Sequence, residues 1–195
     1  TIRADVSEDE DVRSMVQFVQ DRFGRLDILV SNAASGGFRP LMVSNQKNFN
    51  AAMNTNARAL ISLTQAARPL LQREEGRAKV VALSSHGSRM GLPAYGLIGA
   101  SKAALEALVR HLAFELGNAG INFNVVLAGL VETDSTRHLP GAEEMFRAVQ
   151  TRMLVGERAL TTRDVARVVL FLSSPLSDLV QGQTIVVDGG IGISG

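Results

Sequence analysis

The sequence predicts one α/β domain built around a parallel, doubly wound sheet. Segments with helical periodicity alternate with short apolar runs along the whole chain. The apolar runs are continuous instead of alternating, which is typical of strands that helices cover on both faces. No repeat, low-complexity segment or linker divides the 195 residues. We therefore treat residues 1–195 as a single domain.

The composition excludes several other classes of protein. Twenty Lys and Arg residues oppose 19 Asp and Glu, a net charge of +1, so no basic field is available for a nucleic acid. The absence of Cys excludes disulfides, thiolate metal sites and Cys nucleophiles, and it fits a reducing compartment, for which we expect the cytoplasm. No apolar run approaches the ~20 residues of a membrane span.

The first elements are the end of a strand, a helix and a second strand. We expect Thr1–Val6 to end a strand, and Ser7 with Glu10 has the spacing of a capping box for the helix that follows. Apolar residues recur at helical spacing as far as Gly24, which ends the helix. The pattern then predicts a strand and a loop of small residues, Leu26–Val30 and Ser31–Pro40.

Two long helices dominate the remainder. The first is expected over Lys47–Glu74 with a kink at Pro69, and the second over about Tyr95 to Leu116. The other expected elements are strands at Lys79–Leu83, Ile121–Leu127 and Gln183–Asp188, a helix near Ala142–Thr151, and one from Thr161 or Thr162 to Leu172. Ligands of such sheets bind beyond the carboxyl ends of the strands. Those ends are Asp5-Val6, Ser31–Ala34, Ser84-Ser85, Ala128–Thr133 and Asp188–Gly190.

Motifs at these strand ends resemble the short-chain dehydrogenase/reductase family. They are Asn32-Ala33-Ala34 after a strand, Asn56 in the first long helix, Ser84-Ser85 at a strand end, and Tyr95 with Lys102 at the start of the second long helix. The resemblance runs from Thr1 to about Gly190. It implies a Rossmann-like fold and an oxidoreductase that uses a nicotinamide cofactor.

The spacing of Tyr95 and Lys102 narrows the resemblance. Six residues separate them, whereas most members of the family have three. Six is the pattern of the enoyl-acyl-carrier-protein reductases, and the type III enzyme is the most similar. Ser85 keeps the usual separation from Lys102, so only the Tyr has moved, by about 4.5 Å along a helix. In enoyl reduction the hydride enters C3 while charge develops on the C1 oxygen, so a hydroxyl displaced from the nicotinamide suits that reaction.

The resemblance implies a catalytic set of Tyr95, Lys102, Ser85 and Asn56. Tyr95 would hydrogen-bond the thioester oxygen and stabilise the enolate. Lys102 would lower the pKa of Tyr95 and hold the ribose hydroxyls of NADPH, with NADH as the alternative cofactor. Asp5 would accept a hydrogen bond from the adenine amino group. The cofactor-binding residues implied are Asp5, Val6, Asn32, Ala33, Ala34, Lys102, Val131 and Thr133.

Several of these residues also have a purely structural interpretation. Ser85 is alternatively a loop hydroxyl, Asn56 a buried polar bridge, Asp5 part of a capping loop and Thr133 a turn residue. The histidines have no metal-ligand spacing and are expected at the surface, with a substrate contact at His86 as the lesser alternative. The three are His86, His111 and His138. We expect no metal site.

The glycine-rich turn that receives the pyrophosphate in this family does not precede Thr1. We therefore expect about 55 further residues, roughly two strand–helix units, ahead of it. Without them a long apolar sheet edge would be exposed.

Three functions are compatible with the sequence. The leading hypothesis is NADPH-dependent reduction of the 2,3 double bond of an enoyl thioester, carried by acyl carrier protein or CoA, in fatty-acid synthesis. The alternatives are a carbonyl or hydroxysteroid-type oxidoreductase, and a non-catalytic nucleotide-binding protein. Wide apolar faces on the two long helices favour a homodimer or homotetramer.

Overall fold

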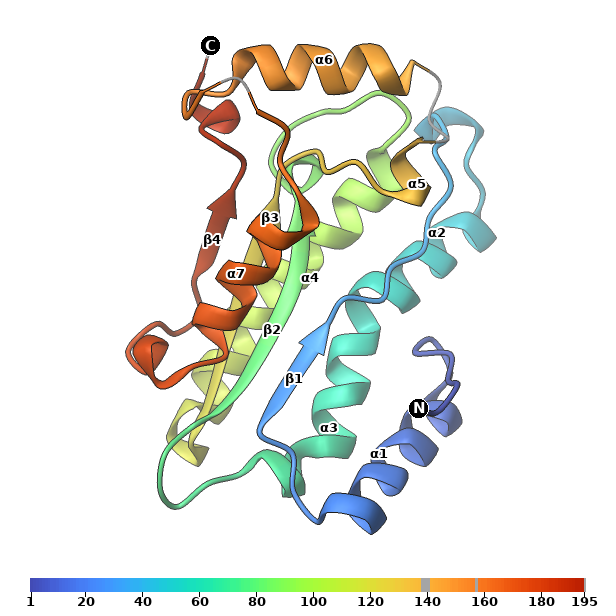
Figure 1. Cartoon of the computed structure of the whole chain (residues 1–195). Coiled ribbons are helices and arrows are strands. Elements are labelled where there is room, and N and C mark those ends of the chain that lie inside the picture. The colour runs from blue at the N-terminus through green and yellow to red at the C-terminus, as the bar shows by residue number, and fades with distance from the viewer. Residues whose placement is uncertain (138–140, 157, 195) are drawn as a thin grey trace.

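Four parallel strands form one sheet in the order β1-β2-β3-β4 in the computed structural model (Figure 1). The structure describes residues 1–137, 141–156 and 158–194. The strands are Ile28–Ser31 (β1), Ala78–Ser85 (β2), Ile121–Ala128 (β3) and Thr184–Val187 (β4). This arrangement confirms the predicted α/β class with a parallel sheet, and the four strands predicted from Leu26 onward all form.

Helices connect the strands and cover the sheet. They are α1 (Asp9–Phe23), α2 (Gln46–Met53), α3 (Ala59–Leu71), α4 (Gly96–Leu116), α5 (Asp134–Arg137), α6 (Ala142–Arg152) and α7 (Thr162–Leu172). Short 3-10 turns lie at Leu41–Val43, His86–Ser88, Gly117–Ala119, Pro175–Ser177 and Ile191–Ile193. Within the described ranges, no helix has the length and apolar character needed to cross a bilayer.

The residues of the two central strands, β2 and β3, are buried on both faces of the sheet, as the continuous apolar runs predicted, whereas β1 and β4 at the edges are only partly buried. Successive side chains of a strand point to opposite faces. Val80 and Phe123 pack in the core formed with α3 and α4. Val81 and Val126 lie in a second, smaller core with Leu172 of α7. Figure 1 shows α7 on the opposite side of the sheet from α4.

The segment Thr1–Val6 forms no strand, so that prediction is wrong. A strand needs a neighbouring strand for its backbone hydrogen bonds, and no described strand pairs with this segment. The edge of the sheet is β1, where Ile28 and Val30 remain 44% and 42% exposed. This is the apolar edge that the sequence led us to expect.

The first long helix forms as predicted over most of its length, with one π-helical interruption that the sequence did not indicate. A π-helical turn, Asn54–Arg58, separates α2 from α3, and α3 ends at Leu71. Pro69 lies in the last turn of α3, so it is near the helix end and not at the interruption. Such wide turns are frequent at functional sites. This one contains the buried Asn56.

Two of the expected helix caps form, the left-handed Gly24 at the end of α1 and Thr161 at the start of α7, and one does not. The Ser7 hydroxyl donates to Asp5 Oδ1 at 2.8 Å, and the N-cap of α1 is Glu8, so the proposed capping box with Glu10 does not form. At α7 the N-cap is Thr161, which forms a reciprocal capping box with Asp164.

The apolar faces of the two long helices are largely used within the chain. Leu60 and Ala67 of α3 and Leu105 and Val109 of α4 belong to the core on that side of the sheet. On α4, Phe114 is 88% exposed. Self-association through these helices therefore stays a prediction.

Candidate active site

The hydroxyls of Ser85 and Tyr95 meet at the carboxyl end of the sheet. Ser85 is the last residue of β2 and Tyr95 is the N-cap of α4, and their oxygens lie 3.0 Å apart. The neighbouring Ser84 points away from Tyr95 and donates to Glu106 Oε1 at 2.6 Å. Alternation along the strand thus identifies Ser85 as the partner of Tyr95.

The backbone around Tyr95 is shaped to hold its ring. Ala94 has φ 56°, a left-handed conformation that is uncommon for a residue with a side chain. Its carbonyl accepts a hydrogen bond from the Arg39 N–H at 2.7 Å, which stabilises this turn into α4. A Cβ atom at Gly87 would overlap the Tyr95 ring, so this position needs a glycine. Neither Ala94 nor Gly87 has a signal in the sequence that predicts its contact with Tyr95.

Lys102 is a buried cation on the same helix. Its side chain extends to the end of β2, where Nζ donates to Leu83 O at 2.8 Å, and the residue is 6% exposed. Burial lowers the pKa of Lys102 to about 8, because leaving water disfavours the charged form. Leu83 O is the one acceptor the described residues offer to an ammonium that has three protons to donate. This ammonium can therefore bind further oxygens.

Asn56 is fully buried and joins two segments of the site. Its Oδ1 accepts from Ser35 N–H, its Nδ2 donates to Ser35 O, both at 2.8 Å, and Nδ2 also donates to Ser101 Oγ at 2.9 Å. The bonds fasten the loop after β1 to α4. These hydrogen bonds match the alternative interpretation of Asn56 as a buried polar bridge. None of them goes to Tyr95 or Lys102.

We expect Asn56→Ala to lower the free energy of unfolding by about 2 to 4 kcal/mol, because it leaves buried polar groups without partners. Urea unfolding measures this loss. Asn118→Ala is the matched control, since Asn118 is exposed and its removal should change stability by less than about 0.5 kcal/mol. Unchanged stability of Asn56→Ala together with a loss of activity would instead place Asn56 among the reacting groups.

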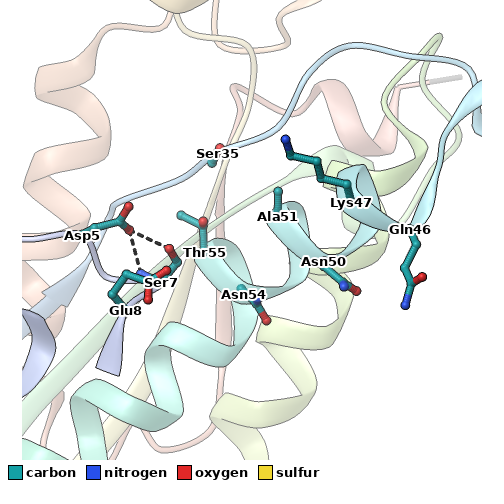
Figure 2. Close-up of a pocket in the computed structure, with 10 residues that line it drawn as sticks. All are labelled: Asp5, Ser7, Glu8, Ser35, Gln46, Lys47, Asn50, Ala51, Asn54 and Thr55. Atoms are coloured by element: carbon teal, nitrogen blue, oxygen red, sulfur yellow. Dashed lines mark hydrogen bonds between the residues drawn. The ribbon is translucent and has the colours of Figure 1, made fainter. Parts of the chain in front are cut away.

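A polar cavity of about 600 Å³ lies between the N-terminal segment, the loop after β1 and α2 (Figure 2). Its lining includes Asp5, Ser35 and Lys47. The Asp5 carboxylate accepts two hydrogen bonds from Ser7, which lower its pKa and keep it an anionic acceptor. Asn32, Ala33 and Ala34 are exposed in the loop that leads to Ser35, and Val6 is half-buried beside Asp5. Of the described residues predicted for adenosine, Asp5 is the one that lines this cavity, and contacts of Val6 and of Asn32–Ala34 with a cofactor stay predictions.

A second, smaller cavity lies directly beside Tyr95. Its volume is about 290 Å³, and most of its lining is apolar. The lining residues are Arg39, Pro40, Leu41, Gly87, Met90, Gly91, Leu92, Ala94, Tyr95 and Gly96. Phe38 extends the apolar wall, with its ring centroid 5.7 Å from that of Tyr95.

The loop after β3 folds on itself around Thr136. Thr136 Oγ1 donates to Val131 O at 2.8 Å and accepts from Thr133 N–H at 2.8 Å. The Thr133 hydroxyl lies 3.0 Å from that of Thr136. Thr133 thus has the bonds of a turn residue, the alternative that the sequence left open. Contacts of Val131 and Thr133 with a cofactor stay predictions.

One of the two histidines that the structure describes differs from its expected surface position. His86 is largely buried, and its Nε2 lies 2.9 Å from Asp188 Oδ2, although this contact lacks the geometry of a hydrogen bond. His111 is exposed as predicted, and His138 lies outside the described residues. No group of three or more potential metal ligands gathers in the part of the chain that the structure describes.

The fold and the Ser85–Tyr95–Lys102 arrangement define a short-chain dehydrogenase/reductase, a class of NAD(P)-dependent oxidoreductases. Comparison with known families then specifies the group within this class. Residues 1–192 match the family model described as enoyl-(acyl carrier protein) reductase, and the chain belongs to this family.

The individual relatives are named for different activities. The chain is 34% identical to a 1-cyclohexenylcarbonyl-CoA reductase of Streptomyces collinus, over 98% of this chain and 68% of the relative. It matches the crystal structure of the NADH-dependent enoyl-[acyl-carrier-protein] reductase of Aquifex aeolicus with a TM-score of 0.90 and 30% identity, over 98% of this chain and 75% of that one. A 7α-hydroxysteroid dehydrogenase complexed with NADH has the same TM-score at 28% identity, over 97% and 72%. The similarity therefore establishes the class of oxidoreductase.

Proposed function

We propose that the protein reduces the 2,3 double bond of an enoyl thioester with a nicotinamide cofactor. The observation that carries this proposal is the position of Tyr95. Its hydroxyl stands at the N-cap of α4, beside an apolar cavity and seven positions before the buried Lys102. Two relatives support the same chemistry, because they are named as reductases of a CoA thioester and of an enoyl-acyl-carrier-protein.

Tyr95 would act on the thioester oxygen. When the double bond is reduced at C3, negative charge moves through C2 to the C1 oxygen, and a hydroxyl donor at that oxygen stabilises the enolate. A free phenol has a pKa of ~10, so it needs a nearby cation to exchange protons near neutral pH. Lys102 on the same helix would supply that positive charge.

The cofactor fits the residues that surround the polar cavity and Lys102. Bound NAD(P)H would supply the hydride. The incompletely bonded ammonium of Lys102 would hold the ribose hydroxyls, and the Asp5 carboxylate would accept from the adenine amino group. We propose NADPH from the type III resemblance, while the Aquifex relative is named for NADH. Titration with each cofactor in turn measures the preference.

The apolar cavity beside Tyr95 would take the acyl chain. Leu41, Met90 and Leu92 line it, and their exposed apolar surface can be covered by hydrocarbon. A thioester carried by CoA or by acyl carrier protein would enter with its carbonyl toward Tyr95. Fatty-acid synthesis is the process in which such a substrate is reduced.

Carbonyl reduction is the second candidate, and a specific observation favours it. Ser85 and Tyr95 are close enough for both hydroxyls to donate to one carbonyl oxygen. That arrangement suits a ketone whose own oxygen receives the proton, and a hydroxysteroid dehydrogenase is among the similar structures.

Product analysis with a matched pair of substrates separates the two candidates. We expect the protein to convert crotonyl-CoA to butyryl-CoA with a higher kcat/KM than it converts acetoacetyl-CoA to 3-hydroxybutyryl-CoA. The two substrates share carrier and chain length, so the comparison isolates the group that is reduced. Turnover of the ketone alone would contradict the proposed function and favour the second candidate.

A further inference from the structure

Glu106 is a buried carboxylate that the proposed chemistry does not use. It lies in α4 one turn after Lys102 and is 7% exposed, although glutamate is rarely buried without partners. Its Oε1 accepts hydrogen bonds from Ser84 Oγ at 2.6 Å and Ser88 Oγ at 2.5 Å. Its Oε2 lies 3.4 Å from Arg89 Nη2 and 3.5 Å from Thr184 Oγ1. Glu106 therefore links α4 to β2, to the turn after β2 and to β4.

The two short bonds fix both ends of the segment that carries the partner of Tyr95. Ser84 and Ser88 flank residues 85–87, and Ser88 Oγ also lies 2.8 Å from Ser85 O. Within this segment Ser85 reaches the Tyr95 hydroxyl. Hydrogen bonds to a carboxylate are stronger than those between neutral groups, so this anchor holds the segment firmly.

The same segment also contacts the ring of Tyr95. Gly87 lies so close to the ring that a Cβ atom there would overlap it. The Gly87 carbonyl in turn packs against Gly99, where α4 leaves room for it. Movement of the segment would therefore displace the Tyr95 hydroxyl through Ser85 and the Tyr95 ring through Gly87.

We propose that Glu106 is a positioning residue, which sets the place of the Tyr95 side chain by anchoring residues 84–88 to α4. Its consequence for turnover rests on the proposed function of Tyr95. The effect of Glu106 on the position of the Tyr95 side chain does not depend on the proposed function. The positioning role and the proposed function can therefore be tested separately.

The experiment follows Tyr95 by NMR with ring-labelled tyrosine, and follows enoyl thioester reduction in parallel. Tyr95 is the single Tyr of the chain, and the spectrum of Tyr95→Phe confirms the assignment of its signal. Glu106→Ala should shift or broaden the ring signal and lower kcat by about 10- to 100-fold, since small misplacements of a reacting group have effects of this size. Glu106→Gln should restore both, because the amide oxygen can accept from Ser84 and Ser88.

Two further variants separate positioning from general destabilisation. Asp178→Ala breaks the ion pair with the buried Lys79, which lies near the opposite end of β2, and should lower stability without moving the Tyr95 signal. If Glu106→Ala does not fold, Ser88→Ala removes one of the two short bonds and should still shift that signal.

The possible outcomes are distinct. An unchanged Tyr95 signal in the folded Glu106→Ala or Ser88→Ala variant overturns the inference, whatever happens to kcat. A shifted signal with unchanged kcat supports the positioning role and contradicts the catalytic role of Tyr95. A shift and a loss of kcat that Glu106→Gln reverses support both.

Discussion

Replacing Tyr95 with Phe is expected to lower kcat for enoyl thioester reduction by about 10²- to 10⁴-fold, the range typical of a lost proton donor. The ring would stay between Gly87 and Phe38, so the fold and the affinity for cofactor should be retained. Steady-state kinetics with saturating cofactor measures the loss, and cofactor titration monitors binding.

The Ser85→Ala variant should be compared with Tyr95→Phe. It removes the oxygen that lies 3.0 Å from the Tyr95 hydroxyl but leaves the phenol in place, so we expect a smaller loss of kcat. Wild-type activity in Tyr95→Phe would contradict the catalytic role of the hydroxyl. The non-catalytic interpretation would be favoured if the unsubstituted protein turned over neither the enoyl thioester nor the ketone.

Replacing Lys102 with Met is expected to weaken cofactor binding and turnover while raising stability near neutral pH. The substitution removes a buried ammonium that the fold must desolvate and replaces it with an apolar chain of similar length. Loss of the positive charge would also remove a group that stabilises the negative charge developing during turnover, so kcat should fall as well as affinity. Cofactor titration, kinetics and urea unfolding measure the three effects.

The lowered pKa of Lys102 determines how the free energy of unfolding changes with pH. The pKa of Lys102 is about 8 in the folded chain, whereas the ordinary lysine value of 10.5 applies in the unfolded chain. Below pH 8 both states bind the proton, whereas between these values the unfolded state binds more protons than the folded state. This group therefore makes the wild type gain stability as the pH rises through that window, by up to about 3 kcal/mol, and Lys102→Met should lose that gain.

Lys79→Met is the matched control, because Lys79 is equally buried but has a carboxylate partner in Asp178. Breaking this pair should lower stability and leave cofactor affinity unchanged. A Lys102→Met variant that binds the cofactor as tightly as the wild type would contradict the role of Lys102 at the ribose.

The apolar pattern predicted the sheet well because burial between two helical layers requires it. It failed at Thr1–Val6, since a strand exists only where another strand pairs with it and a local pattern does not show its partner. The capping box at Ser7 failed because Asp5 offers that hydroxyl a nearer acceptor. The π-helical turn at Asn56 depends on tertiary hydrogen bonds to Ser35 and Ser101, which have no local signal.

The part of the site that could be predicted is the part that depends on the spacing of residues along the sequence. The spacing from Ser85 to Tyr95 and Lys102 predicted residues that the structure brings to one end of the sheet. Glu106 was missed because a lone Glu on a long helix usually faces water. Its hydrogen-bond donors, Ser84 and Ser88, are brought to it only by the packing of β2 against α4, which the sequence does not show directly.

The most direct test of the account is a crystal structure of the protein with the oxidised cofactor and an enoyl thioester. We expect the Tyr95 hydroxyl to donate to the C1 oxygen of the thioester while C3 faces the nicotinamide C4. The three-residue displacement of Tyr95, about 4.5 Å along a helix, would then have its explanation in the distance between those two substrate atoms. A Tyr95 hydroxyl that instead contacts a substituent of the carbon facing C4 would contradict enoyl reduction.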